Sequence, residues 1–163
     1  KMASLYEKTA PSEAVELYET ALSLAQKSHQ KDKIINTLYL LAQLYQNLFH
    51  YAIADSVYQL LLPYYSSNKP IKLAECYFLR ATNFYKWSKY KLAAKYLIKS
   101  RTLYEKLGIK AGQAKTLKEE AKVWANYNDY AKAIGLLQRS YDIYKQLGDE
   151  EGMASIQTLL GTI

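Results

Sequence analysis

Residues 121–133 read AKVWANYNDYAKA, and this stretch decides the fold because the chain contains it three times in varied form. Residues 81–93 read ATNFYKWSKYKLA, 40 positions earlier, and residues 42–54 read AQLYQNLFHYAIA, a further 39 positions earlier. Each copy has a small residue, an aromatic three positions later, a tyrosine six positions after that, and an alanine another three positions on. A fixed period of this length is typical of arrays of helical repeats.

The same period extends beyond these three copies. Tyr65, Tyr104 and Tyr144 are separated by 39 and 40 residues, which accounts for part of the unusual total of 17 tyrosines. Large residues form a further column three positions after a column of small ones, so one helical face carries both. Small residues allow helices to approach closely, and we expect the aromatic rings to fill the remaining space. The small columns are Ala42, Ala81, Ala121 and Gly161, and Ala14, Ala54, Ala93 and Ala133.

Apolar residues within each period recur at steps of three and four on both sides of a short break, which predicts two helices per repeat. No segment alternates with period two, so we predict an all-α fold and no sheet. The pattern predicts about nine helices, with neighbours packed antiparallel. They cover residues 1–9, 12–28, 32–48, 51–65, 70–87, 90–107, 111–127, 130–147 and 151–163.

These helices group into one repeat domain over residues 1–163. A partial repeat at 1–30 is followed by repeats 31–69, 70–109 and 110–149 and by a second partial repeat at 150–163. Both ends cut a repeat, and Leu159, Leu160 and Ile163 do not resemble the polar face of a capping repeat. The sequence therefore indicates a fragment of a longer array, whose uncapped ends could associate end to end.

Four residues interrupt the pattern. Pro63 is expected to end or bend its helix early, because its ring removes a backbone donor. Gly135, inside a helix, suggests that a neighbouring backbone comes close. Arg80 and Glu120 replace apolar residues of one column in consecutive repeats, which suggests an ion pair between repeats. The alternative is that each side chain bends out to water.

The composition excludes several classes of protein. With 163 residues, 50% hydrophobic and 23% charged, the chain can bury a core and is not disordered. A net charge of +7 favours acidic partners. The single cysteine, Cys76, excludes an internal disulfide and a cysteine-rich zinc site, and we expect it to be a packing residue. We see no membrane span and no signal peptide, and expect a cytoplasmic location.

Nothing in the sequence indicates catalysis. His29 and His50 lie 21 residues apart, and neither has a metal or nucleophile spacing to Cys76. No glycine-rich loop suited to phosphate is present. We therefore expect no enzyme, no cofactor and no metal, and we expect His50 to be a solvated histidine in the turn of a repeat.

The repeated motifs resemble the tetratricopeptide repeat (TPR), with a small residue and an aromatic late in the first helix and an aromatic and an alanine opening the second. At 39 or 40 residues the period exceeds the usual 34. It looks like the longer repeats of bacterial regulatory and sensor proteins and of some eukaryotic adaptors. This resemblance implies a right-handed superhelix of antiparallel helix pairs, whose first helices line a concave groove that holds peptides or protein segments.

With the first helices facing inward as in that family, polar and aromatic residues would line the groove, and three lysines would form a positive stripe. The alternative for the stripe is a solvated helix face. Most tyrosines fit packing between helices, whereas Tyr39, Tyr85 and Phe78 fall on the expected groove face. The expected groove residues are Asn36, Tyr39, Gln43, Gln46, Asn47, Phe78, Thr82, Tyr85, Lys86, Lys115, Lys118, Lys122 and Asn126.

The predicted function is a non-catalytic scaffold whose partner is another protein or a peptide segment, acidic where it meets the lysines. An alternative is a regulatory sensor array that reads a signalling peptide and controls an effector domain outside this chain. Nucleic-acid binding is less favoured, because net charge alone suggests it and the repeat already accounts for the aromatics.

Overall fold

The computed structural model describes residues 10–65 and 69–163, and in these ranges all regular structure is α-helical. The predicted helices 12–28 to 130–147 are confirmed, each within one residue at either end. The last helix ends three residues earlier than predicted, and the helix expected at 1–9 lies outside the described residues. The helices are α2 (Pro11–Lys27), α3 (Lys31–Asn47), α4 (Tyr51–Tyr65), α5 (Pro70–Lys86), α6 (Tyr90–Lys106), α7 (Lys110–Asn126), α8 (Tyr130–Leu147) and α9 (Glu150–Leu160).

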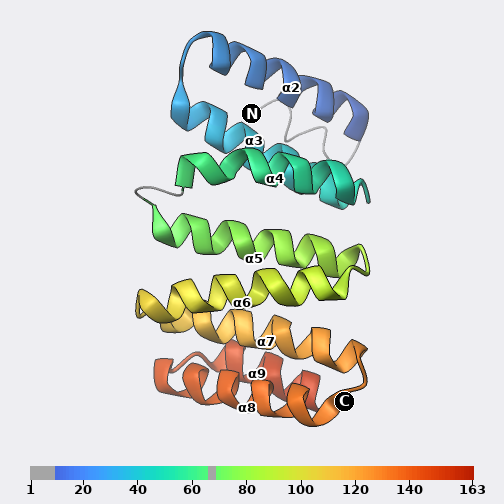
Figure 1. Cartoon of the computed structure of the whole chain (residues 1–163), viewed down its shortest axis with the longest axis vertical. Helices are drawn as coiled ribbons and strands as arrows, with labels where there is room; N and C mark the ends of the chain where they lie inside the picture. Colours follow the sequence, from blue (N-terminus) through green and yellow to red (C-terminus); the bar gives the residue numbers. More distant parts are fainter. Residues whose placement is uncertain (1–9, 66–68) are drawn as a thin grey trace. The chain divides into compact units, whose positions relative to one another are not determined.

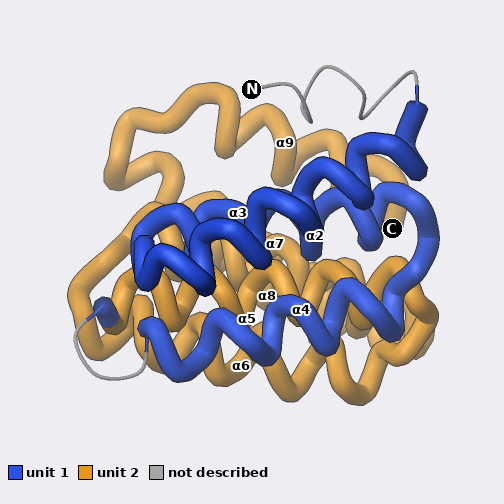
Figure 2. The backbone as a smooth tube through the Cα atoms, turned by 90° about the horizontal axis from the view of Figure 1, so that it is seen from above, with its two compact units in different colours: residues 1–69 blue, residues 70–163 orange. Residues whose placement is uncertain are grey.

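The chain divides into two compact units, residues 1–69 and residues 70–163 (Figure 2). Unit 1 contains α2, α3 and α4, and unit 2 contains α5 to α9. Inside unit 1, α3 packs against both α2 and α4. Inside unit 2, α5 pairs with α6 and α7 with α8, while α6 also packs on α7 and α8 on α9 (Figure 1).

The predicted columns of small residues are buried, apart from one member. Gly161 is the exception and is exposed at the end of α9. The remaining members are fully buried, with no exposed surface: Ala14, Ala42, Ala54, Ala81, Ala93, Ala121 and Ala133.

Most helices end in a residue with left-handed backbone. Gly108 and Gly148 occupy this position in two turns, each with φ of 68°. Four other turns use side-chain residues instead, at His29, Phe49, Ser88 and Asn128. Each turn is closed by two backbone hydrogen bonds; at Ser88, for example, Ser88 N donates to Tyr85 O and Lys89 N donates to Phe84 O.

The two residues expected to disturb helices differ in outcome. Pro63 lies inside α4, and the described residues break off two positions later at Tyr65, so the early helix end expected there stays a prediction. Gly135 is exposed on α8, and a Cβ built there would meet nothing within 4 Å. The expected close backbone approach at Gly135 is therefore wrong.

Close packing occurs instead at Gly112 and Gly152, near the starts of α7 and α9. A Cβ built on Gly112 would lie 2.5 Å from Cδ1 of Tyr104, and one built on Gly152 would overlap the ring of Tyr144 in the same way. Each tyrosine belongs to the preceding helix, α6 or α8. The missing side chain thus makes room for a ring at both junctions between a second helix and the next first helix.

A buried serine joins each helix pair of unit 2. Ser100 Oγ on α6 donates to Ala74 O on α5, and Ser140 Oγ on α8 donates to Ala114 O on α7, both at 2.8 Å. The residues of the two bonds lie 40 positions apart. Unit 2 therefore repeats its hydrogen bonding as well as its apolar packing.

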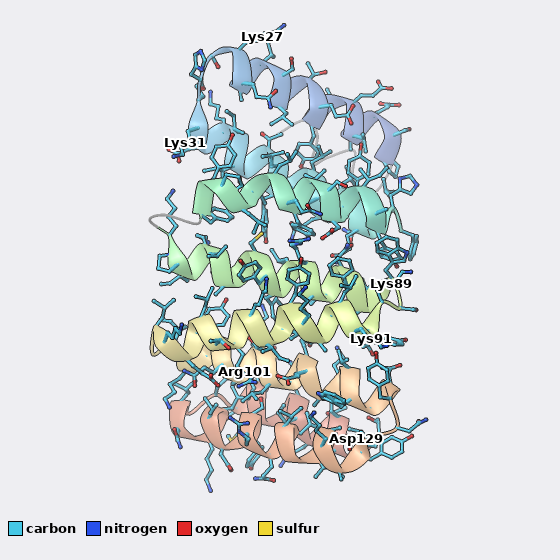
Figure 3. The ribbon with its side chains drawn as sticks, in the orientation of Figure 1. Lys27, Lys31, Lys89, Lys91, Arg101 and Asp129 are labelled. Atoms are coloured by element: carbon cyan, nitrogen blue, oxygen red, sulfur yellow. The ribbon has the colours of Figure 1, made fainter. Side chains whose placement is uncertain are left out.

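The ion pair expected between Arg80 and Glu120 is wrong, because Glu120 pairs with Arg101 of α6. Arg101 Nε lies 3.1 Å from Glu120 Oε2, and Arg101 Nη1 lies 2.8 Å from Glu105 Oε1 (Figure 3 labels Arg101). Burial by itself would lower the pKa of Arg101, but the two carboxylates raise it overall. Arg80 lies over Tyr96 instead, 4.3 Å from the ring centroid. The expectation failed because α6, which lies between α5 and α7 in the chain, supplies Arg101 as the partner of Glu120.

Candidate functional site

The expected groove residues of unit 1 lie on α3 and differ in accessibility. Asn36 and Asn47 are exposed, and Gln43 Nε2 donates to Tyr39 Oη at 3.0 Å, with both side chains half-buried. Gln46 is only 7% exposed, and among the described residues its Nε2 has no hydrogen-bond partner. In unit 1 the surface therefore consists of two free amides beside a paired tyrosine and glutamine.

In unit 2, lysines of α7 lie over aromatic rings of α5. Lys115 Nζ lies 4.5 Å from the ring centroid of Phe78, and Lys122 Nζ lies 5.6 Å from that of Tyr85. These are cation–π distances. Lys118 Nζ donates to Ser155 Oγ of α9 at 3.3 Å. Each contact joins residues 37 positions apart. The first helices of the repeats in unit 2, which are α5, α7 and α9, therefore contact one another at equivalent positions.

We call this surface the first-helix face, made by Phe78 and Tyr85 of α5, Lys115, Lys118, Lys122 and Asn126 of α7, and Ser155 of α9. Its lysines are not an unpaired stripe, because each has a neighbour in the fold. Lys122 also forms an ion pair with Glu119, with Nζ 2.8 Å from Oε2. The charge is therefore held in place by rings and a carboxylate, while an ammonium group keeps further donors for a ligand.

The most exposed polar cluster of this face is formed by Tyr85, Lys122 and Asn126. Asn126 Nδ2 lies 2.9 Å from Tyr85 Oη, to which it donates, and 2.8 Å from Lys122 O. Tyr85 is half-buried and Asn126 is exposed. The hydroxyl proton of Tyr85 and the amide oxygen of Asn126 remain available, which are one donor and one acceptor such as a peptide backbone can pair.

These three residues line one side of a cavity of about 320 Å³. Apolar side chains that include Leu159 and Ile163 form much of the remaining lining. An apolar floor with a few convergent polar groups is the usual composition of a binding site. From the sequence, Leu159 and Ile163 were expected only to belong to an uncapped end. Because they are far from Tyr85 along the chain, their place in the same cavity was not predicted.

The other expected residues lie outside the cluster. Phe78 is only 8% exposed because its ring lies beneath Lys115. Thr82 is half-buried and its Oγ1 donates to Leu79 O of its own helix. Lys86 is exposed at the end of α5. The structure thus gathers Tyr85, Lys122 and Asn126 into one cluster, while Phe78, Lys115 and Lys118 lie elsewhere on the first-helix face.

Shifted pKa values occur on tyrosines that pack between helices. Burial raises the pKa of Tyr104 to about 12, and the charge of Glu75 adds to this effect. Burial also raises the pKa of Tyr45 to about 12, together with the bond that Tyr45 Oη donates to Glu19 Oε1 at 2.8 Å. These shifts reflect packing and do not mark reactive groups.

Within residues 10–65 and 69–163, no group of three or more His, Cys, Asp and Glu side chains could hold a metal ion. None of the helices in those ranges combines the length and apolar character required to cross a bilayer.

Comparison with known proteins gives structural matches only. No protein-family model matches the chain, and no curated protein matches its sequence. The crystal structure of BtubC (BKLC) from P. vanneervenii is similar, with a TM-score of 0.81 and 18% identity over 95% of this chain. This chain spans 66% of that protein's length.

A second similar structure is a putative kinesin light chain from Podosopora anserina with nearly identical TPR-like repeats. It has a TM-score of 0.73 and 15% identity over 99% of this chain and 84% of its own. A variant of the same protein gives a TM-score of 0.74 at 14% identity. The chain therefore has the fold of the TPR-like helical repeat proteins.

Proposed function

We propose that the protein is a non-catalytic docking module whose first-helix face holds a segment of another protein. The observation that carries this proposal is the cluster of Tyr85, Lys122 and Asn126 beside a partly apolar cavity. The TPR-like fold supports it in general terms, since arrays of helix pairs present extended surfaces suited to recognition.

The partner would lie across α7 as an extended segment or a helix. The amide of Asn126 and the hydroxyl of Tyr85 would bond its backbone, and an apolar side chain would enter the cavity near Leu159. An acidic side chain would meet Lys122, which is still partly exposed after pairing with Glu119. The preferred partner therefore combines an apolar anchor with at least one carboxylate.

The test uses a partner captured from extract of the source cells and then purified for titration. Changing Tyr85→Phe and Asn126→Ala together removes both polar groups without disturbing buried atoms. We expect affinity to fall at least about tenfold, because two hydrogen bonds each contribute roughly 1 kcal/mol. A matched pair of changes on α8, Tyr141→Phe with Gln138→Ala, should leave affinity unchanged.

The acidic character of the partner is tested by changing Lys115, Lys118 and Lys122 to Glu. Affinity should fall more than for the amide and hydroxyl changes, with circular dichroism showing that the helices remain. If this variant binds the partner as tightly as the wild-type chain, then Lys115, Lys118 and Lys122 do not contact the partner. Equal affinity of the Tyr85→Phe and Asn126→Ala variant would reject the first-helix face itself.

A further inference from the structure

A second hollow in unit 2 lies along α6. It has a volume of about 710 Å³ and is lined by α6 together with Trp124 and Tyr127 from the end of α7. Ala94 and Ile98 form its aliphatic part, and its surface is almost entirely apolar. This hollow shares no residue with the cavity of the first-helix face.

Large apolar side chains remain in contact with solvent here. Ile98 is 43% exposed and Tyr127 is 42% exposed. A smaller hollow at the start of α6 shares Lys91 and Tyr127 with the 710 Å³ hollow and includes the exposed Leu92. The apolar surface therefore continues along the helix. A continuous apolar strip of this kind, edged by polar groups, is typical of a surface that binds a partner.

The edge of the hollow is formed by lysines. Lys91, Lys95 and Lys99 are spaced by four, so they follow one side of α6. No Asp or Glu occurs between Glu75 and Glu105. The acidic residue that follows Tyr127 most closely, Asp129, caps α8 by accepting a bond from Lys132 N at 3.1 Å. Lys89 and Lys91 are both labelled near the start of α6 (Figure 3).

The lysines at and near the hollow differ in their contacts within the fold. Lys99 Nζ lies 5.4 Å from the ring centroids of both Tyr77 and Tyr96, and Lys132 Nζ lies 3.3 Å from that of Trp124. Lys91 and Lys95 are exposed and form no salt bridge within the described part of the chain. Their charge is therefore directed to solvent, next to an apolar floor.

We propose that this lysine-rimmed pocket, made by Lys91, Lys95, Ile98, Lys99, Trp124 and Tyr127, binds an acidic protein segment that inserts an apolar side chain. An aliphatic or aromatic anchor would cover Ile98 and Tyr127, and carboxylates on both sides of it would meet Lys91 and Lys95. This surface is independent of the first-helix face.

Charge by itself would also attract nucleic acid, but the floor does not suit it. Phosphates gain nothing from the aliphatic surface of Ala94 and Ile98. Bases bind single-stranded sites by stacking on open rings, and Lys132 already covers one face of Trp124. An acidic peptide with an apolar centre fits both features of the pocket.

The experiment uses the whole chain with Trp87→Phe, which leaves Trp124 as the only tryptophan and as a fluorescent reporter in the pocket wall. The probe is acetyl-Asp-Glu-Glu-Leu-Phe-Glu-Glu-Asp-amide. Two control peptides replace Leu-Phe by Ser-Ser, or every acid by its amide. We expect the probe to shift Trp124 emission and to bind at least about tenfold more tightly than either control.

Charge reversal at the rim, Lys91→Glu with Lys95→Glu, should weaken the probe at least about tenfold, because attraction becomes repulsion at two contacts. The matched variant Lys106→Glu with Lys145→Glu makes the same change in net charge at other exposed positions. It should keep the wild-type affinity within about twofold.

Three results would overturn the proposal. The first is an absence of binding by the probe, or equal binding of the Ser-Ser peptide. The second is an equal loss of affinity in the two charge-reversed variants. The third is tighter binding of a ten-residue oligothymidylate than of the probe, with the same dependence on Lys91 and Lys95, which would assign the pocket to nucleic acid.

Discussion

The two junctions of unit 2, between α6 and α7 and between α8 and α9, share one construction, but a charged contact in the first is replaced by an apolar one in the second. At both, a tyrosine ring occupies the space left by a glycine, Tyr104 at Gly112 and Tyr144 at Gly152. Four positions before each tyrosine, a buried serine bonds a carbonyl of the partner helix. These elements recur because they set how closely the helices approach.

The differing contact lies at positions 101 and 120 in the first junction and 141 and 160 in the second. Arg101 and Glu120 form a largely buried ion pair, with Glu120 Oε2 3.1 Å from Arg101 Nε. Tyr141 and Leu160 pack instead against the apolar cluster of the second junction. The same helix arrangement therefore accepts a charged or an apolar pair, which indicates that this position contributes less to the repeat than the serine, tyrosine and glycine.

Breaking the ion pair from one side should have the largest effect. In Arg101→Met, the carboxylate of Glu120 stays buried without its partner, since its side chain is only 5% exposed. We expect the free energy of unfolding to fall by about 3 kcal/mol, measured by urea denaturation. The double change Arg101→Tyr with Glu120→Leu copies the second junction and should stay within about 1 kcal/mol of wild type. A double variant as unstable as the single one would show that the two junctions are not interchangeable.

Filling the glycine positions should have the next largest effect. Gly112→Ala and Gly152→Ala each force a methyl group onto a tyrosine ring, and we expect each to lower the free energy of unfolding by about 2 kcal/mol. Gly135→Ala is the matched control, because it adds the same group in open space inside a helix. It should stabilise the protein by up to about 1 kcal/mol. Effects of the same sign at all three glycines would contradict the packing described here.

Removing the serine bonds should have a smaller and equal effect at the two sites. Ser100→Ala and Ser140→Ala each delete one buried hydrogen bond of 2.8 Å, which contributes about 1 kcal/mol. Thermal unfolding of both variants should show matching losses. A loss at only one serine would mean that the bonds do not serve the same purpose in the two repeats.

The junction tyrosines make stability depend on pH only in alkaline solution. The pKa of Tyr104 is raised to about 12 and that of Tyr144 is also raised, in both cases mainly by burial. A raised pKa means that the unfolded chain loses these protons first, so stability is complete below about pH 10 and falls as the pH approaches 12. Tyrosinate absorbance should show Tyr45 and Tyr104 titrating late, and Tyr104→Phe should reduce the amplitude of that late step. Titration of all tyrosines near pH 10 would contradict this.

The sequence predicted the helices well because each is specified by many residues at once. Apolar spacing, fully buried alanines such as Ala81 and Ala121, and the 40-residue period all indicated the same bounds. The turns were harder to predict, since Phe49 and Ser88 take left-handed backbone that glycine more often takes. In those turns the two backbone hydrogen bonds that close the turn hold the left-handed conformation, although the residue there is not glycine.

The candidate sites were predictable only in part, because they depend on distances between helices. The register placed Tyr85, Lys122 and Asn126 on one face, but not the bonds that join them. The pairing of Glu120 with Arg101 could not be predicted by comparing equivalent positions of successive repeats, because Arg101 lies on α6, between the two helices compared. The pocket on α6 had a signal in the sequence: the spacing of Lys91, Lys95 and Lys99 around Ile98 in a stretch without acids.

The most direct test of the proposed docking function is hydrogen–deuterium exchange of the whole chain with and without its captured partner. Our account predicts slower exchange on binding in α7 and in the facing parts of α5 and α9, around Tyr85, Lys122 and Asn126. Exchange that is unchanged in all three helices, with a partner bound at saturation, would contradict it.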